Sequence, residues 1–180
     1  MLANQFKIAM KTLVMMPTYN ELQTLERSVK DLFRHNPAVG LLVIDDNSPD
    51  GTSAQVEQLI KEYPDNIFLL KRTSKLGLGT AYIAGFKWAL KRHYDFIFEM
   101  DADFSHNPKD LLRLYSACEN ENCDMVIGSR YVTGVNVVNW PMNRVLLSWG
   151  ASRYVRWITG MKIDDTTAGF ICYRRHVLEA

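Results

Sequence analysis

The chain has 180 residues, of which 47% are hydrophobic and 23% are charged, and its formal net charge is +1 at pH 7. These values are ordinary for one soluble globular domain with a buried core. A net charge this close to zero argues against nucleic acid as the partner. No apolar run approaches the about 18–20 residues that a membrane-spanning helix needs.

The cysteines and the N-terminal residues give further expectations. Cys118, Cys123 and Cys172 are odd in number and lack the spacing of metal ligands, so they predict free thiols in a reducing compartment. Lys7 and Lys11 interrupt the first apolar residues, and no small-residue cleavage pattern follows. We therefore expect no signal peptide.

Short apolar runs alternate with amphipathic segments along the chain. Buried strands are predicted at residues 12–16, 41–44, 67–70, 96–100 and 125–128. Four helices are predicted. Asn20 and Thr52 are the candidate caps of the first and second, the third covers residues 79–92, and Pro108 suits the first turn of the fourth. In the first helix, one face carries Leu22, Leu25, Val29, Leu32 and Phe33. The alternation predicts an α/β fold with a mostly parallel, Rossmann-like sheet flanked by helices.

Polar segments follow four of the predicted strands. They are PTYNE at 17–21, DDNSPDGT at 45–52, DADFSHN at 101–107 and SRY at 129–131. Turn chemistry alone accounts for any one of them. Because the carboxyl ends of parallel strands meet at one edge of the sheet, the four together predict a ligand site there.

Asp101 and Asp103 are the strongest feature of this edge. Residues two apart in extended chain point the same way, so both carboxylates can face one ligand while Ala102 points away. Mg²⁺ and Mn²⁺ are commonly held by one or two carboxylates together with water and substrate phosphate oxygens. The pair therefore predicts a divalent cation bound with a phosphorylated substrate.

Two neighbouring features have less chemical interpretations. His106 is predicted to be a turn residue or a group that supports the carboxylates, rather than a catalytic base. Lys75 opens the segment KLGLGT, whose spacing does not match a phosphate-binding P-loop. Gly77 and Gly79 are expected to let this segment turn into the third helix.

The motifs MPTYNE, VIDDNSPDGT, KLGLGTAYIAGFKWAL, MDADFSHNP, IGSRY, NWPMNR and DDTTAGFICYRR occur in this order. Together they resemble the family-2 glycosyltransferases of the GT-A fold, and among them the dolichol-phosphate and polyprenol-phosphate mannosyltransferases. The resemblance covers residues 12–178 and implies one catalytic domain over residues 1–180. It implies transfer of mannose from GDP-mannose to a polyprenyl or dolichyl phosphate, with inversion and with Mg²⁺ or Mn²⁺.

The resemblance also implies roles for particular residues. Donor-binding positions are Pro17, Tyr19, Glu21, Ile44, Asp46, Asp101, Ala102, Asp103 and Arg130. The metal ligands are Asp101 and Asp103; Ser105 stands where some relatives carry a ligating glutamine, and its shorter side chain puts coordination there in doubt. Asp103 and Arg130 are the expected catalytic residues, and Arg130, Arg144 and Ser148 the acceptor-phosphate residues. The resemblance gives no role for Asp165 and Thr166.

A lipid-linked acceptor implies a protein that works at the cytoplasmic face of a membrane. Residues 137–158 combine apolar side chains, including Trp140, Trp149 and Trp157, with Arg144, Arg153 and Arg156. This composition is typical of a helix lying in the membrane interface, although a core helix accounts for it equally well. The last residues, RRHVLEA, read as the start of a helix, so we expect the full-length protein to continue.

Three alternatives stay open. Within the enzyme class, a UDP-glucose-dependent polyprenyl-phosphate glucosyltransferase or another family-2 glycosyltransferase fits the same motifs. A receiver-type phosphoacceptor module also has acidic residues at strand ends, but it needs its acidic pair after the first strand and a lysine after the fifth. A nucleotide-binding protein without catalytic activity is the third.

Overall fold

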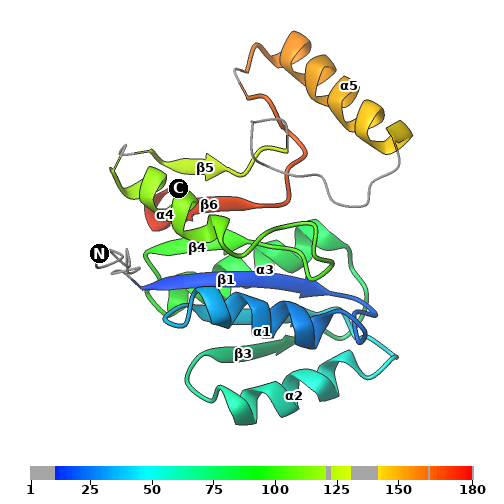
Figure 1. The fold of residues 1–180 in the computed structure, drawn as a ribbon, viewed down its shortest axis with the longest axis vertical. Helices are drawn as coiled ribbons and strands as arrows, with labels where there is room; N and C mark the ends of the chain where they lie inside the picture. Colours follow the sequence, from blue (N-terminus) through cyan, green and yellow to red (C-terminus); the bar gives the residue numbers. More distant parts are fainter. Residues whose placement is uncertain (1–10, 121–122, 131–141, 162, 180) are drawn as a thin grey trace, which may run out of the picture.

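The computed structural model describes residues 11–120, 123–130, 142–161 and 163–179, and within 142–149 it describes the side chain of Ser148 alone. In this part of the chain, six strands form one sheet with helices on both faces (Figure 1). The strands are β1 (Thr12–Thr18), β2 (Gly40–Asp45), β3 (Ile67–Lys71), β4 (Phe96–Glu99), β5 (Met125–Ile127) and β6 (Ile171–Arg174). The helices are α1 (Leu25–His35), α2 (Thr52–Glu62), α3 (Leu78–Lys91), α4 (Asp110–Asn120), α5 (Met142–Thr159) and α6 (Arg175–Glu179).

The strand order is β3-β2-β1-β4-β6-β5. The pairs β1–β2, β2–β3 and β1–β4 are parallel, whereas β6 is antiparallel to both β4 and β5. β5 therefore runs in the same direction as β4, and the carboxyl ends of β1 to β5 lie at one edge. The predicted α/β fold with a mostly parallel sheet is confirmed.

Strand residues alternate between two hydrophobic cores, one on each face of the sheet. On one face, Val14, Val43 and Phe98 pack with apolar residues of α1, α2 and α4. On the other face, Met15 and Ile44 pack beneath α3. Because β1 and β2 are buried on both faces, they read as continuous apolar runs.

The first helix begins later than predicted. Asn20 is not its cap: it adopts a φ of 62°, and α1 begins at Leu25. The backbone N–H groups of Asn20 and Leu22 donate to Ser48 Oγ and Asp50 Oδ2, at 3.0 and 3.1 Å. These bonds tie the segment after β1 to the loop after β2, so it forms the rim of the sheet edge and leaves Leu22 exposed.

The second and fourth helices also differ slightly at their starts. Thr52 is the first residue of α2 rather than its cap, which is Gly51. Asp50 Oδ1, just before the cap, accepts from the Thr52 N–H and hydroxyl at 2.9 and 2.6 Å. α4 begins at Asp110, and Pro108 lies in the turn just before it. Asn107 Oδ1 accepts from Lys109 N at 3.1 Å and serves as the cap of that turn.

Candidate active site

A cavity of about 270 Å³ opens at the carboxyl edge of the sheet, between the segments that follow β1, β2, β3 and β4. It is lined by Pro17, Thr18, Tyr19, Glu21, Asp46, Lys75, Gly77, Leu78, Ala81, Asp101, Ala102 and Asp103. Seven of the residues expected to bind the donor are among them: Pro17, Tyr19, Glu21, Asp46, Asp101, Ala102 and Asp103. Segments far apart in sequence therefore meet at one cavity.

The two consecutive aspartates after β2 have different surroundings. Asp45 is buried and accepts hydrogen bonds from the hydroxyls of Thr18 and Ser53, at 3.2 and 2.6 Å. Asp46 lines the cavity, and its Oδ1 lies 2.6 Å from Arg72 Nη1 in an almost fully buried ion pair. Asp45 thus holds the loops at the rim, whereas Asp46 presents a carboxylate that Arg72 already partly neutralises.

Asp101 and Asp103 follow β4 and both line the cavity, with Ala102 buried between them. Asp103 is exposed, and its Oδ1 accepts from Ser105 N at 2.9 Å. Among the described residues, no three His, Cys, Asp or Glu side chains are grouped as a complete metal cage. Two carboxylates at an open cavity fit Mg²⁺ or Mn²⁺, since these ions keep several waters and take further oxygens from a bound phosphate.

Asp101 has polar and titratable neighbours on its inner side. His106 Nε2 lies 3.3 Å from its Oδ2, and the Tyr82 hydroxyl donates to its Oδ1 at 3.5 Å. His106 is itself nearly buried and stacks on Phe170, with 5.2 Å between ring centroids. These contacts fix the Asp101 carboxylate from behind and leave it open toward the cavity.

Burial and negative charge shift the pKa values near Asp101. Burial raises the pKa of Glu99 to about 7. A hydrogen bond from Tyr173 lowers this pKa, and the negative charge of Asp101 raises it further. Burial and the Asp101 charge also raise the pKa of Tyr82. The Tyr82 hydroxyl therefore stays protonated and remains a hydrogen-bond donor to Asp101 at neutral pH.

Lys75 and Leu78 belong to the cavity but were not predicted from the sequence. Lys75 Nζ lies 3.8 Å from the centroid of the Tyr19 ring, a cation–π contact across the cavity mouth. Lys75 is the one Lys or Arg among the described lining residues. Gly77, with a φ of 92°, turns the chain from this lysine into α3, as the sequence predicted. The sequence signal that could have identified Lys75 is a lysine just before a glycine-containing turn that follows a strand.

Three of the residues predicted for the donor or the metal are not among those that line the cavity. The side chain of Ile44 is fully buried beneath α3, which leaves only its main chain for the predicted donor contact. Ser105 lies beyond Asp103 and contacts it through the backbone N–H. Arg130 follows β5, and β6 lies between β5 and β4, the strand that leads to Asp101.

Arg130 forms a two-pronged ion pair with Asp165. Its Nε and Nη2 donate to Asp165 Oδ2 and Oδ1 at 2.8 and 2.6 Å, and its backbone N–H donates to Oδ2 at 3.0 Å. Asp165 is fully buried; burial alone would raise its pKa, but the hydrogen bonds and charge of Arg130 outweigh burial and lower it. The segment DDTT, for which the resemblance implied no role, therefore fixes the guanidinium of Arg130.

The same segment contacts α5. Thr167 Oγ1 accepts from Arg130 Nη2 at 2.6 Å and lies 3.0 Å from Ser148 Oγ, so Ser148 and Arg130 share one neighbour. Arg144 is one helical turn before Ser148 in α5, but its side chain is outside the described residues. The predicted acceptor pair is thus described in part.

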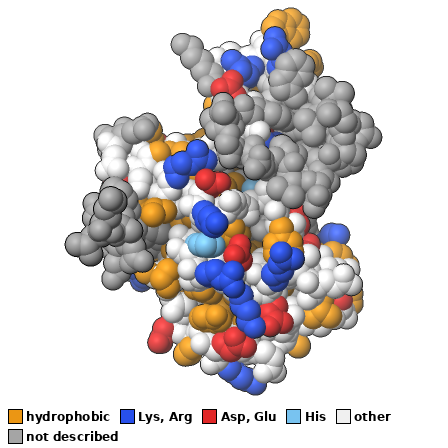
Figure 2. Space-filling model, viewed as in Figure 1, with side chains coloured by type: hydrophobic (Ala, Val, Ile, Leu, Met, Phe, Trp, Pro, Cys, Tyr) orange, Lys and Arg blue, Asp and Glu red, His pale blue; other side chains and the backbone are white. Residues whose placement is uncertain are grey.

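The last turns of α5 carry an exposed apolar surface. Trp157 is 82% exposed, and Tyr154 and Ile158 are also exposed, as is Met161 just after the helix. Arg156 on the same helix pairs with Asp164. Among the described residues, no helix is both long enough and apolar enough to cross a membrane. The face drawn in Figure 2 carries Lys and Arg interspersed with Asp and Glu over α1 and α2, in keeping with the low net charge.

Known proteins resemble this chain along almost its whole length. It is 49% identical over 169 residues to a polyprenol monophosphomannose synthase of Mycolicibacterium smegmatis and 46% identical over 171 residues to an undecaprenyl-phosphate mannosyltransferase of Micrococcus luteus. These matches cover 94% and 95% of the chain. The chain spans 63% of the length of the first relative and 69% of the second.

Solved structures with low sequence identity share the fold. A mannosyltransferase from Pyrobaculum calidifontis, solved with GDP-Man and Mn²⁺, matches 94% of the chain, with a TM-score of 0.65 and 20% identity over 46% of its own length. Glucosyl-3-phosphoglycerate synthase from Mycobacterium tuberculosis, solved with Mn²⁺, UDP-Glc and phosphoglyceric acid, gives the same TM-score and identity over 58% of its length.

The sequence profile of glycosyl transferase family 2 matches residues 13–180. The carboxylates at the strand ends, the shared fold and this match agree, and the chain belongs to glycosyl transferase family 2.

Proposed function

We propose that this chain is the catalytic domain that transfers mannose from GDP-mannose to a polyprenyl phosphate, with inversion at the sugar carbon and dependence on a divalent cation. The observation that carries the proposal is the cavity at which PTYNE, Asp46 and the Asp101–Asp103 pair meet. The polyprenol monophosphomannose synthase and the undecaprenyl-phosphate mannosyltransferase, which are 49% and 46% identical to the chain, support the choice of sugar and acceptor.

The donor occupies the cavity in this proposal. Pro17, Tyr19 and Glu21 form its wall after β1 and contact the nucleoside, while Asp46 contacts it from β2. Asp101 and Asp103 hold the divalent cation, which when bound offsets the negative charge of the departing diphosphate. Lys75 brings a positive charge to the same cavity and can pair with diphosphate oxygens.

The acceptor needs no strong general base. A phosphate monoester carries about −1.5 to −2 charge at neutral pH and is already a nucleophile. What it needs is positioning and charge compensation, which arginine side chains provide. Arg130 is held by Asp165, and Thr167 joins it to Ser148. These contacts support an acceptor-phosphate site between β5 and α5, and Arg144 belongs to that site in this proposal.

A polyprenyl phosphate lies in a bilayer, so the domain works at a membrane surface. The exposed Tyr154, Trp157 and Ile158 at the end of α5 favour the interfacial interpretation of this helix over the core-helix interpretation. Aromatic side chains of this kind lie at the level of lipid headgroups. We expect weak vesicle binding that increases with anionic lipid and decreases with salt; no binding at low salt, with or without anionic lipid, would contradict this part of the proposal.

The decisive experiment compares two donors. Calorimetric titration with GDP-mannose and with UDP-glucose, each with MnCl₂, measures which nucleotide sugar the cavity selects. We expect tight binding of GDP-mannose and much weaker binding of UDP-glucose, followed by transfer of labelled mannose to a polyprenyl phosphate in detergent. A preference for UDP-glucose would assign the chain to the glucosyltransferases, and binding of neither would refute the donor site.

A further inference from the structure

Two consecutive residues of α1 contact the two residues that flank Asp103. Ser28 Oγ donates to the Ala102 carbonyl oxygen at 2.7 Å, and both residues are buried. The guanidinium carbon of Arg27 lies 4.8 Å from the centroid of the Phe104 ring, within cation–π range. α1 therefore holds the loop on both sides of the exposed carboxylate of Asp103.

Phe104 has a backbone conformation that needs such support. Its φ is 63°, in the left-handed region, which is disfavoured for a residue with a bulky side chain. A strained residue keeps its conformation only where the surrounding structure determines it. Since Asp103 immediately precedes Phe104, relaxation of Phe104 would turn the Asp103 carboxylate away from its present direction.

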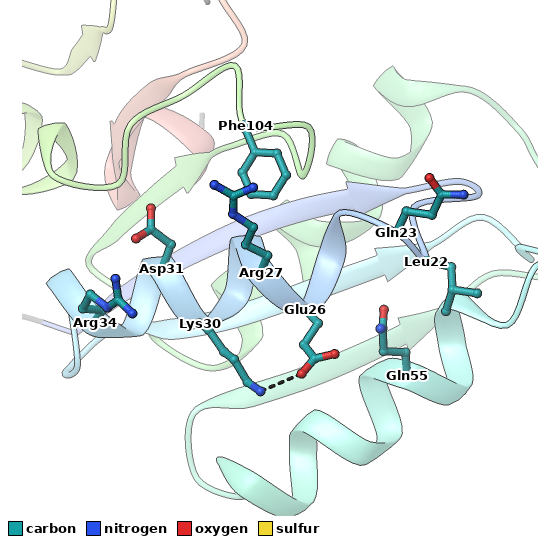
Figure 3. Close-up of a pocket in the computed structure, with 9 residues that line it drawn as sticks. All are labelled: Leu22, Gln23, Glu26, Arg27, Lys30, Asp31, Arg34, Gln55 and Phe104. Carbon is teal, nitrogen blue, oxygen red and sulfur yellow. Dashed lines mark hydrogen bonds and ion pairs between the residues drawn. The ribbon is translucent and has the colours of Figure 1, made fainter.

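Figure 3 shows how the contact is made. Arg27 rises from the middle of α1 toward Phe104, at one side of a groove of about 500 Å³. Lys30, one turn later, points away from Phe104 to an ion pair with Glu26 at 2.6 Å (Figure 3). Arg34 lies near the other end of the same groove. The groove thus contains two arginines of one helix, of which Arg27 supports the Asp103 loop.

We propose that Arg27 and Ser28 are positioning residues for the metal: they hold the 102–104 loop so that Asp103 can share a divalent cation with Asp101. The inference rests on the proposed function, in which these two carboxylates bind the ion. Residues that orient metal ligands without touching the metal commonly change its affinity by about 10–100-fold. Neither Arg27 nor Ser28 lines the donor cavity, so their effect is expected in metal affinity and not in the nucleotide contacts.

The test measures Mn²⁺ binding in the presence of GDP by electron paramagnetic resonance, together with the melting temperature without metal. We expect Arg27→Ala and Ser28→Ala to weaken Mn²⁺ binding about 10-fold. Arg27 is exposed, so Arg27→Ala should keep the wild-type melting temperature. Arg34→Ala is the matched control, because it removes the same side chain from the same groove without removing a contact to Phe104, and it should bind Mn²⁺ like the wild type.

Phe104→Gly separates positioning from general stability. Glycine adopts a positive φ without strain, and this relief offsets part of the stability lost with the half-buried ring, so the melting temperature should change little. It lacks the ring that Arg27 stacks on, so it should bind Mn²⁺ as weakly as Arg27→Ala, and the double variant should be no weaker than either single one.

The outcomes separate this inference from the proposed function. If the wild type with GDP does not bind Mn²⁺, the proposed metal site fails, and the inference fails with it. If the wild type binds, Asp103→Ala does not, and Arg27→Ala and Phe104→Gly bind like the wild type, the positioning role alone is refuted. Equal weakening by Arg34→Ala would also refute it, because the effect would then come from the charge of α1.

Discussion

Gly169, in the segment before β6, approaches the Asp101 carboxylate so closely that a single methyl group tests the site. A Cβ added there would lie 2.8 Å from Asp101 Oδ2 and 3.3 Å from His106 Nε2. The backbone of Gly169 is not in the left-handed region, so alanine itself is allowed. Gly169→Ala therefore displaces the carboxylate while leaving the fold in place.

The size of the displacement follows from ordinary contact distances. Ordinary van der Waals contact of a Cβ begins at 3.4 Å, so from 2.8 Å the carboxylate oxygen must retreat by roughly 0.6 Å. Asp101 has little room to do so, because His106 and Tyr82 contact its two oxygens from behind. Metal and catalytic groups tolerate about 0.5 Å of error, and a misplacement of 1 Å can cost about 100-fold in rate. We expect kcat/KM to fall about 10–100-fold.

The assay combines steady-state mannose transfer, Mn²⁺ titration and thermal unfolding. Gly150→Ala is the control, since a Cβ at Gly150 in α5 would meet nothing within 4 Å and alanine stabilises a helix by about 0.5–1 kcal/mol relative to glycine. Gly169→Ala should lose Mn²⁺ affinity with a nearly unchanged melting temperature. Wild-type affinity and rate in this variant would refute the argument that the Asp101 carboxylate, held at this position, binds the metal.

Three more predictions concern the metal, the acceptor and the buried ion pair. Asp103→Ala should lower activity about 10²–10³-fold, as loss of a main electrostatic group does; survival of wild-type activity in EDTA would show that the ion has no such role. Arg144→Ala should raise the KM for the lipid phosphate and leave GDP-mannose affinity unchanged, and equal loss of both in binding assays would contradict this. The pKa of Asp165 is lowered in the folded protein from its ordinary value of 3.8, so its carboxylate stabilises the fold at pH values above 3.8. This contribution is lost as the pH falls through the lower, folded-state pKa. Asp165→Asn should therefore be less stable than the wild type in urea unfolding at pH 7, by about 3 kcal/mol or more, because it removes the buried negative charge that pairs with Arg130. The difference should shrink near pH 3, and a constant difference at both pH values would contradict the ion-pair explanation.

The sequence was most informative where the signal is local. Apolar runs predicted five of the described strands, because strands buried on both faces must be apolar throughout. The polar segments after those strands could then be placed at one edge from the direction of a parallel sheet alone. The segment PTYNE was placed at this edge in that way. The family resemblance, rather than the pattern, singled out Pro17, Tyr19 and Glu21 within it, and all three line the cavity.

Contacts between distant segments were not predictable in this way. Asp165 and Arg130 are 35 residues apart, and nothing in either local pattern indicates that they pair. The antiparallel β6 lies between β4 and β5 and so separates Arg130 from the strand that Asp101 follows. This separation depends on the order of the strands in the sheet, which the periodicity of the sequence does not predict. Asn20 was assigned as a helix cap for the same reason. It adopts a left-handed conformation, its N–H bonds to Ser48 and the N–H of Leu22 bonds to Asp50, and the local sequence does not reveal these contacts with another loop.

The position of β6 links the two halves of the site. The segment that leads into this strand contacts the proposed metal site through Gly169, which packs against Asp101, and the proposed acceptor site through Asp165, which holds Arg130. Thr167 lies between them and contacts Ser148 of α5. A glycosyl transfer requires the sugar carbon and the acceptor oxygen to be brought within about 3–3.5 Å of each other. Because Asp165, Thr167 and Gly169 belong to one short segment and contact both proposed sites, we expect a shift of this segment to change the distance between the donor and the acceptor.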